Sequence, residues 1–312
     1  MAATTDEIGQ KLIPLLVKLD EAVGFTGVGK GHDHDAFFEG MHLEAARTGI
    51  PYPEGSTLWH AFHTAANHAY LCYPNHPLEV RIYNGIYTWL AVVVDDIAQV
   101  DVEEWLQFAP RFLTGAEHSN PVAREWARWL LLSYQHYSTA TASFIVTSSL
   151  EFASSSALEG SAVPRITPTA GGKSWPGYLR EKTGLGEVYA LMTFPKATCP
   201  DISCFMEAVR DMDSWIYKVN DIMSFYKEEL ARDKDNYLNI RAAYEGISAF
   251  EMLRKVLEET VDEHRRIELA LQGKEPYAQL WRNHVLGFVA FHKATERYKL
   301  RDLGLDEILP KK

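Results

Sequence analysis

Apolar residues recur at helical spacing along almost the entire chain, and this pattern limits the folds that the sequence can adopt. Between residues 5 and 23, one helix face gathers Ile8, Leu12, Leu15, Leu16 and Leu19. Comparable long helical patterns cover residues 56–72, 78–98, 121–158, 201–231, 246–271 and 276–299. The strict alternation of apolar and polar residues that is typical of a half-buried strand is almost absent. The sequence therefore predicts an all-α fold.

The most irregular stretch, residues 159–177, reads EGSAVPRITPTAGGKSWPG and is rich in Gly, Pro, Ser and Thr. It lies between two helical regions and contains no run of like charges. We interpret it as a loop inside one helical domain that spans residues 1–312. Within that domain, we expect residues 1–35 to be partly peripheral.

The balance of charges bears on the partners of the chain. Acidic residues outnumber Lys and Arg by 42 to 31, which gives a formal net charge of −11. Such a surface does not attract nucleic acid or anionic lipid, but it is compatible with a divalent cation that carries an anionic substrate. The longest apolar runs, such as residues 90–94, are far shorter than the ~20 residues that span a bilayer. With a polar, acidic N-terminus, the sequence predicts a cytoplasmic protein without stable membrane insertion.

Two aspartates, Asp95 and Asp96, follow five apolar residues in the run LAVVVDDIAQVD. Adjacent carboxylates in a core are costly unless a cation pairs with them, so a cation site is one interpretation of this pattern. Taken alone, the segment favours the other interpretation, in which the helix simply ends there and both acids face water.

A second polar group follows in VNDIMSFYKEEL, residues 219–230. Asn220, Ser224 and Glu228 are spaced four residues apart, which places them within about 80° of arc on one helix face, with Lys227 among them. An amide, a hydroxyl and a carboxylate are hard oxygen ligands that suit magnesium, and the lysine could contact a phosphate. The alternative, an ordinary polar helix face, accounts poorly for Asn and Ser, because both are weak helix formers.

Four segments together resemble the motifs of class I terpene synthases. VNDIMSFYKEE resembles their NDxxSxxKE magnesium motif, and the aspartates at 95 and 96 resemble their aspartate-rich motif. PGYLREKTGLGE, residues 176–187, resembles the segment with the diphosphate-sensing arginine, and Arg297-Tyr298 resembles the pair that closes over diphosphate. The segments occur in the order of the family, between residues 56 and 300. The likeness is strongest to fungal sesquiterpene cyclases of the trichodiene-synthase type.

The resemblance implies a helical bundle around a deep central cavity, in which farnesyl diphosphate is ionised with the help of three Mg²⁺ ions. It implies that Asp95 binds two ions and that Asn220, Ser224 and Glu228 bind the third. The diphosphate would be contacted by Arg180, Lys227, Arg297 and Tyr298, and Asp96 would pair with Arg297 on closure. The sequence departs from the family at Gln99, where the last acid of the aspartate-rich motif is often found, and Asp101 follows only at a looser spacing.

A carbocation formed in this way needs an apolar pocket that excludes water, with aromatic faces to stabilise it. Helix-face arithmetic places Thr88, Ala91 and Val92 beside Asp95. Further candidates for the pocket are Phe62, Tyr87, Phe144, Phe152, Trp215 and Tyr217. For each aromatic residue the alternative is plain core packing.

Two other functions remain open at this stage. A synthase that elongates prenyl diphosphates is the nearest enzymatic alternative, although the NDxxSxxKE motif favours cyclisation. A non-catalytic helical scaffold is the second, and it would show no dependence on magnesium. A homodimer is also left open, and the cyclised product cannot be derived from the sequence.

Overall fold

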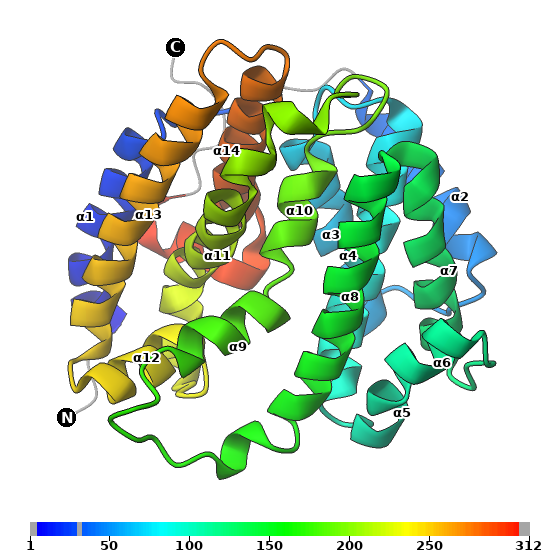
Figure 1. The fold of residues 1–312 in the computed structure, drawn as a ribbon. Helices are drawn as coiled ribbons and strands as arrows, with labels where there is room; N and C mark the ends of the chain where they lie inside the picture. The colour runs from blue at the N-terminus through cyan, green and yellow to red at the C-terminus, as the bar shows by residue number, and fades with distance from the viewer. Residues whose placement is uncertain (1–4, 30–32, 306–312) are drawn as a thin grey trace.

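A computed structural model describes residues 5–29 and 33–305, and in these ranges the chain forms fourteen α-helices, five short 3₁₀ helices and no strand (Figure 1). The α-helices are α1 (Thr5–Ala22), α2 (His34–Arg47), α3 (Thr57–Cys72), α4 (Leu78–Ala98), α5 (Val102–Leu106), α6 (Phe108–Thr114), α7 (Pro121–His136), α8 (Thr139–Glu159), α9 (Trp175–Thr183), α10 (Gly186–Met192), α11 (Val209–Ala231), α12 (Tyr237–Glu245), α13 (Ala249–Leu271) and α14 (Tyr277–Ala294). The 3₁₀ helices are η1 (Val163–Arg165), η2 (Ile202–Cys204), η3 (Met206–Ala208), η4 (Glu296–Tyr298) and η5 (Leu300–Leu303). The prediction of an all-α fold is confirmed.

The helices begin where the sequence supplies side-chain caps. The Ser56 hydroxyl accepts a hydrogen bond from the Trp59 amide at the start of α3, and the Asn120 side chain caps α7. The helical region predicted from residue 121 onward divides into α7 and α8, because Ser138 caps a new helix through the Thr141 amide. The loop predicted at 159–177 is mostly irregular, but it includes η1 and the first residues of α9.

Several short helices were not predicted, namely α5, α6, α9, α10 and α12. The break between α9 and α10 is the most informative of these regions. Leu185 adopts a left-handed backbone conformation there, with φ of 51°. A Cβ atom at Gly186 would lie only 2.4 Å from the Asp213 carbonyl oxygen, so the glycine lets α10 begin directly against α11.

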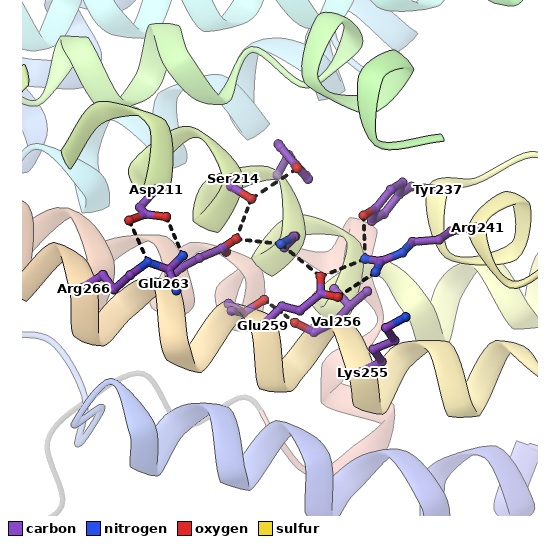
Figure 2. Close-up of polar contacts among 12 residues, drawn as sticks. Asp211, Ser214, Tyr237, Arg241, Lys255, Val256, Glu259, Glu263 and Arg266 are labelled. Carbon is purple, nitrogen blue, oxygen red and sulfur yellow. Dashed lines mark hydrogen bonds and ion pairs between the residues drawn. The ribbon is translucent and has the colours of Figure 1, made fainter. Parts of the chain in front are cut away.

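The arrangement of the helices places α11 near the centre of the bundle. α13 packs along one side of α11, α10 packs along another, and α3 lies between α4 and α14 (Figure 1). α1 contacts α11 and α13 through a fully buried face that includes Leu12 and Leu19. Between α11 and α13 lies a cluster of paired charges around Lys218 and Glu263 (Figure 2).

The buried apolar side chains form one continuous core, in which Trp89, Trp126, Trp215 and Trp281 are almost completely inaccessible to solvent. None of the described helices combines the length and the apolar character that crossing a bilayer would require.

Candidate active site

A cavity of about 320 Å³ lies among α3, α4, α8, α11 and α14. All the residues predicted to hold metal or diphosphate line it, namely Asp95, Arg180, Asn220, Ser224, Lys227, Glu228, Arg297 and Tyr298. The rest of its wall combines polar side chains with a group of apolar and aromatic ones, namely Ala91, Val92, Phe152, Leu185, Tyr189, Ile216, Phe288 and Phe291. The fold thus brings four distant sequence segments to one polar region beside an apolar wall.

The charges around this cavity do not balance. Among the described residues that line it, five are acidic, namely Asp95, Glu159, Asp221, Glu228 and Asp235. Three are cationic, namely Arg180, Lys227 and Arg297. This excess of two formal negative charges favours the entry of a cation.

Asn220 is held from several directions on the cavity face of α11. Its Oδ1 accepts a hydrogen bond from Arg180 Nη2 at 3.1 Å. Its Nδ2 lies 3.1 Å from His292 Nε2 and 3.4 Å from the Tyr298 hydroxyl oxygen. One turn further along α11, the Ser224 side chain borders the same cavity and is buried. The amide and the hydroxyl therefore lie on one helix face, as their spacing predicted.

Glu228 is the third of the predicted metal ligands on this face of α11. Its Oε1 accepts a hydrogen bond from Lys227 Nζ at 3.2 Å, whereas its Oε2 is buried and has no hydrogen-bond partner among the described residues. Burial raises the pKa of Glu228, and the charge of Lys227 opposes that rise. A buried carboxylate oxygen without a donor, beside an amide and a hydroxyl, fits the ligand set of a hard divalent cation.

No group of three His, Cys, Asp or Glu side chains is placed to hold a metal ion by itself in the described part of the chain. Besides the Glu228 carboxylate, an ion on this face of α11 would therefore depend on the Asn220 amide, the Ser224 hydroxyl and oxygen atoms from substrate or water. Magnesium commonly binds in this way, with few carboxylates and several waters or phosphate oxygens.

Arg180 approaches the site from α9. Its guanidinium contacts the Asp221 carboxylate through Nε at 3.0 and 3.1 Å and through Nη2 at 2.8 Å. Burial alone would lower the pKa of Arg180, but the charge of Asp221 outweighs it and the pKa rises. Gly184 closes the turn behind this arginine, because a Cβ atom there would lie 2.7 Å from the Arg180 carbonyl oxygen. Arg180 is thus a fixed cation at the edge of the cavity.

The opposite wall is formed by the end of α4. Asp95 is half-buried, and burial together with the neighbouring charge of Asp96 raises its pKa to about 6, while Arg180, Arg297 and Lys227 oppose that rise. Asp96 is exposed and lines an adjacent cleft with Arg297. No ion pair within 4.0 Å joins Asp96 to Arg297 among the described contacts, so their pairing on closure stays a prediction.

Gln99 occupies the position of the missing acid, and a carboxylate from another helix lies beside it. Gln99 Nε2 donates a hydrogen bond to Glu159 Oε2 at 3.5 Å. A Cβ atom at Gly160 would lie 2.1 Å from the Gln99 carbonyl oxygen, so the glycine permits this close approach of α8 to α4. Burial, with the charge of Asp95, raises the pKa of Glu159 to about 7.

The structure places some of the predicted pocket residues at the cavity and others away from it. Thr88, Ala91, Val92, Phe152 and Tyr217 line the cavity. The other four candidates do not, namely Phe62, Tyr87, Phe144 and Trp215. Phe62 packs against Tyr52 and Trp89, Tyr87 is hydrogen-bonded to Ser149, Trp215 packs against Trp281, and Phe144 is exposed on α8. Three of these side chains are therefore core residues, and the fourth is a surface residue.

Other residues at or beside the site were not predicted from the sequence. His68, Glu159, Tyr189, Phe288 and Phe291 line the cavity, and His292 lies behind Asn220. None belongs to a recognisable motif. The helical spacing of Phe288 and Phe291 places them on one face of α14, but it does not show that this face meets the cavity.

Comparison with known proteins agrees with this geometry. The model of the trichodiene synthase family matches residues 55–307. Longiborneol synthase from Gibberella zeae is 36% identical over 280 residues, which cover 88% of this chain and 83% of that protein. Terpene synthase BipA from Cochliobolus sativus is 35% identical over 259 residues, which cover 82% of this chain and 79% of that protein.

Solved structures show the same fold at lower sequence identity. The linalool/nerolidol synthase from Streptomyces clavuligerus aligns with a TM-score of 0.65 and 11% identity, covering 84% of this chain and 97% of the other. Hedycaryol synthase aligns with a TM-score of 0.61 and 14% identity, covering 84% and 94%. With the family match over residues 55–307, these findings confirm the resemblance drawn from the motifs, and the chain belongs to the trichodiene synthase family of terpene synthases.

Proposed function

We propose that this protein is a magnesium-dependent sesquiterpene cyclase that ionises farnesyl diphosphate, releases diphosphate and cyclises the resulting carbocation to a hydrocarbon or an alcohol. The observation that carries the proposal is the composition of one cavity. Oxygen ligands and three cations line it together with an apolar wall. The charged leaving group needs the polar ligands and cations, and the reactive hydrocarbon chain needs the apolar wall beside them.

The leaving group is the first requirement of the reaction. When bound, magnesium ions would neutralise the charge that develops on the diphosphate. Asp95 would hold ions from the α4 side, and Asn220, Ser224 and Glu228 would hold one from α11. Both sets of oxygen atoms face the same cavity, which supports this division.

Hydrogen-bond donors from the chain would complete the diphosphate site. Arg297 can offer a planar fork to two oxygen atoms, and Lys227 offers a point charge. Arg180 can donate from Nη1, because its Nε and Nη2 already contact Asp221 and Asn220. Lys227 Nζ also lies 5.9 Å from the centre of the Tyr298 ring, so both groups serve one part of the cavity. Burial raises the pKa of Tyr298 to about 12, which keeps its hydroxyl protonated and able to donate.

The carbocation is the second requirement. The rings of Phe152, Phe288 and Phe291 offer polarisable faces without a nucleophilic atom, and Ala91 and Val92 leave room beside Asp95. These residues would exclude water and fold the chain of the substrate. Substrate length rests on the resemblance to sesquiterpene cyclases and on a relative from Metarhizium brunneum named as an (E)-beta farnesene synthase.

The test is a comparison of substrates, because another relative is named as a monoterpene synthase. The purified protein is incubated with geranyl, farnesyl or geranylgeranyl diphosphate and Mg²⁺, and volatile products and released diphosphate are measured. We expect cyclic C15 products from farnesyl diphosphate and none without the metal. A longer prenyl diphosphate as product would indicate chain elongation instead. A protein that neither reacts nor gains thermal stability from Mg²⁺ with diphosphate would be a scaffold.

A further inference from the structure

We propose that His292 is a positioning residue, which holds the Asn220 amide with its oxygen turned toward the magnesium position. The inference rests on the proposed function and deepens it, because it assigns a role to a residue outside the recognised motifs. His292 does not line the cavity itself. It lies in α14 behind Asn220 and is completely buried.

The protons on the His292 ring follow from its neighbours. Its Nδ1 lies 2.7 Å from the Phe288 carbonyl oxygen, and a carbonyl oxygen can only accept a hydrogen bond, so Nδ1 carries the proton. The ring is completely buried and forms no ion pair with a carboxylate among the described residues, so it is neutral. Nε2 is therefore without a proton and can only accept. Independently, Arg180 Nη2 can only donate, so the Asn220 atom that faces it is Oδ1, and the amide nitrogen faces Nε2.

This bare nitrogen determines the orientation of the amide. The Asn220 side-chain atom that lies 3.1 Å from Nε2 must be a donor, which makes it Nδ2. If the amide were reversed, Oδ1 would face Nε2, and two acceptors would meet in a buried place. The amide nitrogen would then point toward the cation, which it cannot ligate. His292 thus opposes the rotation of the Asn220 amide that would turn its oxygen, the magnesium ligand, away from the cation.

Tyr298 supports the same orientation. Its hydroxyl oxygen lies 3.4 Å from Nδ2 and can accept the second amide hydrogen. Both hydrogens of Asn220 are then directed away from the cation position, and Oδ1 is on the side of Arg180. Because the Tyr298 oxygen accepts here, its own proton is left for a diphosphate oxygen.

The ring of His292 is also confined. Its centre lies 4.5 Å from that of Phe288, 5.0 Å from that of Phe291 and 4.4 Å from that of Tyr298. Packing of this kind fixes the direction of Nε2, as the partners behind metal ligands commonly do.

Not every buried histidine on α14 is placed in this way. His284, two turns earlier, is also completely buried, and it stacks on Trp281 with ring centres 5.3 Å apart. Neither of its ring nitrogens has a hydrogen-bond partner among the described residues. His284 is therefore a core residue, and it supplies a matched control for substitutions at His292.

The test uses three substitutions and measures binding as well as activity. His292→Phe keeps an aromatic ring but removes the acceptor. His292→Asn keeps a donor near Nδ1 and leaves nothing at Nε2, whereas His292→Gln places an amide oxygen near Nε2. The control is His284→Phe. For each variant, thermal unfolding is followed while Mg²⁺ is titrated in the presence of inorganic diphosphate, and KM for Mg²⁺ and kcat are measured with farnesyl diphosphate.

We expect His292→Phe and His292→Asn to raise the Mg²⁺ concentration for half-maximal stabilisation about 10-fold or more. His292→Gln should recover most of that loss, and His284→Phe should show wild-type Mg²⁺ dependence. Equal Mg²⁺ dependence in wild type, His292→Phe and His292→Asn would overturn the inference while leaving the proposed function intact. If His292→Phe does not fold, the comparison of Asn with Gln decides. If the wild-type protein gains no stability from Mg²⁺ with diphosphate, the proposed function fails first and the inference fails with it.

Discussion

The two polar faces of α11 differ in how their charges are compensated. On the face toward α13, Lys218 contacts Glu263 at 2.6 Å and Glu259 at 3.1 Å. Arg241 completes the group through two bonds to Glu259, at 2.6 and 2.8 Å (Figure 2). Two carboxylates thus meet two cations, and the cluster is neutral. The cavity face carries an excess of negative charge instead.

An unpaired oxygen alone does not distinguish the two faces. Glu263 Oε2 and Glu228 Oε2 are both buried without a hydrogen-bond partner among the described residues. Glu263, however, is packed between helices and its other oxygen accepts from both Ser214 and Lys218. Glu228 borders a cavity that also contains Asn220 and Ser224. The two faces therefore differ in charge balance and in access to a cavity. The neutral, enclosed cluster around Glu263 holds helices together, whereas the negatively charged face around Glu228 is open to a ligand.

The largest effect is expected on the cavity face. Glu228→Ala should lower turnover of farnesyl diphosphate roughly 100- to 1000-fold, because it removes a charged ligand that acts when charge develops on the leaving group. The fold should lose little stability, since the removed carboxylate is buried and incompletely compensated. Steady-state kinetics at saturating Mg²⁺ and chemical unfolding measure the two effects separately.

Glu229→Ala is the matched control for this variant. Glu229 is next to Glu228 on α11, but it pairs with Lys234 and does not line the cavity. It should keep turnover close to that of the wild type. Near-normal activity of Glu228→Ala, or an equal loss in both variants, would contradict the assignment of Glu228 as a ligand.

The opposite pattern is expected on the face toward α13. Lys218→Met should lower the free energy of unfolding by about 3 kcal/mol, because it leaves the buried Glu263 carboxylate without its cation, although half-buried Glu259 keeps its bonds to Arg241. The folded fraction should still be stabilised by Mg²⁺ with diphosphate. Urea unfolding measures the loss, and Arg265→Ala, which breaks an exposed pair with Asp262, serves as the control. A variant of normal stability would show that this cluster does not hold α11 to α13.

The sequence predicted these two faces unequally. Spacing alone placed Asn220, Ser224 and Glu228 on one side of a helix, because that geometry depends only on the helical repeat. Lys218 and Glu263 are 45 residues apart, and no periodicity links two helices across such a distance. The pairing becomes visible only when α13 lies against α11.

The same limit explains the corrected pocket residues. Helix-face arithmetic assigned Thr88 and Val92 to the cavity, since both lie on the face of α4 that carries Asp95. It could not show that Tyr87 turns toward Ser149 of α8. Glu159 and His292 escaped notice for the same reason, because each meets its partner from a helix 60 or more residues away.

The smallest expected effect concerns the pH dependence of the protein without metal. Burial and Asp96 raise the pKa of Asp95 to about 6 from an ordinary value near 3.8, so the folded state binds its proton more tightly than the unfolded state. This residue therefore costs stability as the pH rises from about 4 to 6, and the cost is complete above that range. In the cluster around Lys218, by contrast, burial would raise the pKa of Glu259, but the contacts with Arg241 and Lys218 outweigh it and lower this pKa to about 2. Neutralising that carboxylate would therefore cost stability.

Asp95→Asn isolates the contribution of Asp95. The buried histidines also make stability depend on pH, but they do so equally in the variant and in the wild type. Without metal, the variant should be more stable than the wild type at pH 8 by about 1 kcal/mol. This is less than a rise of the Asp95 pKa from 3.8 to about 6 implies, because Asp95 is partly solvated. The difference should shrink at pH 5, where the folded wild type is mostly protonated. With Mg²⁺ and diphosphate the order should reverse at pH 8, because ionised Asp95 then serves as a ligand. Urea unfolding at both pH values measures all three quantities, and a metal-free wild type that is the more stable protein at pH 8 would refute the raised pKa.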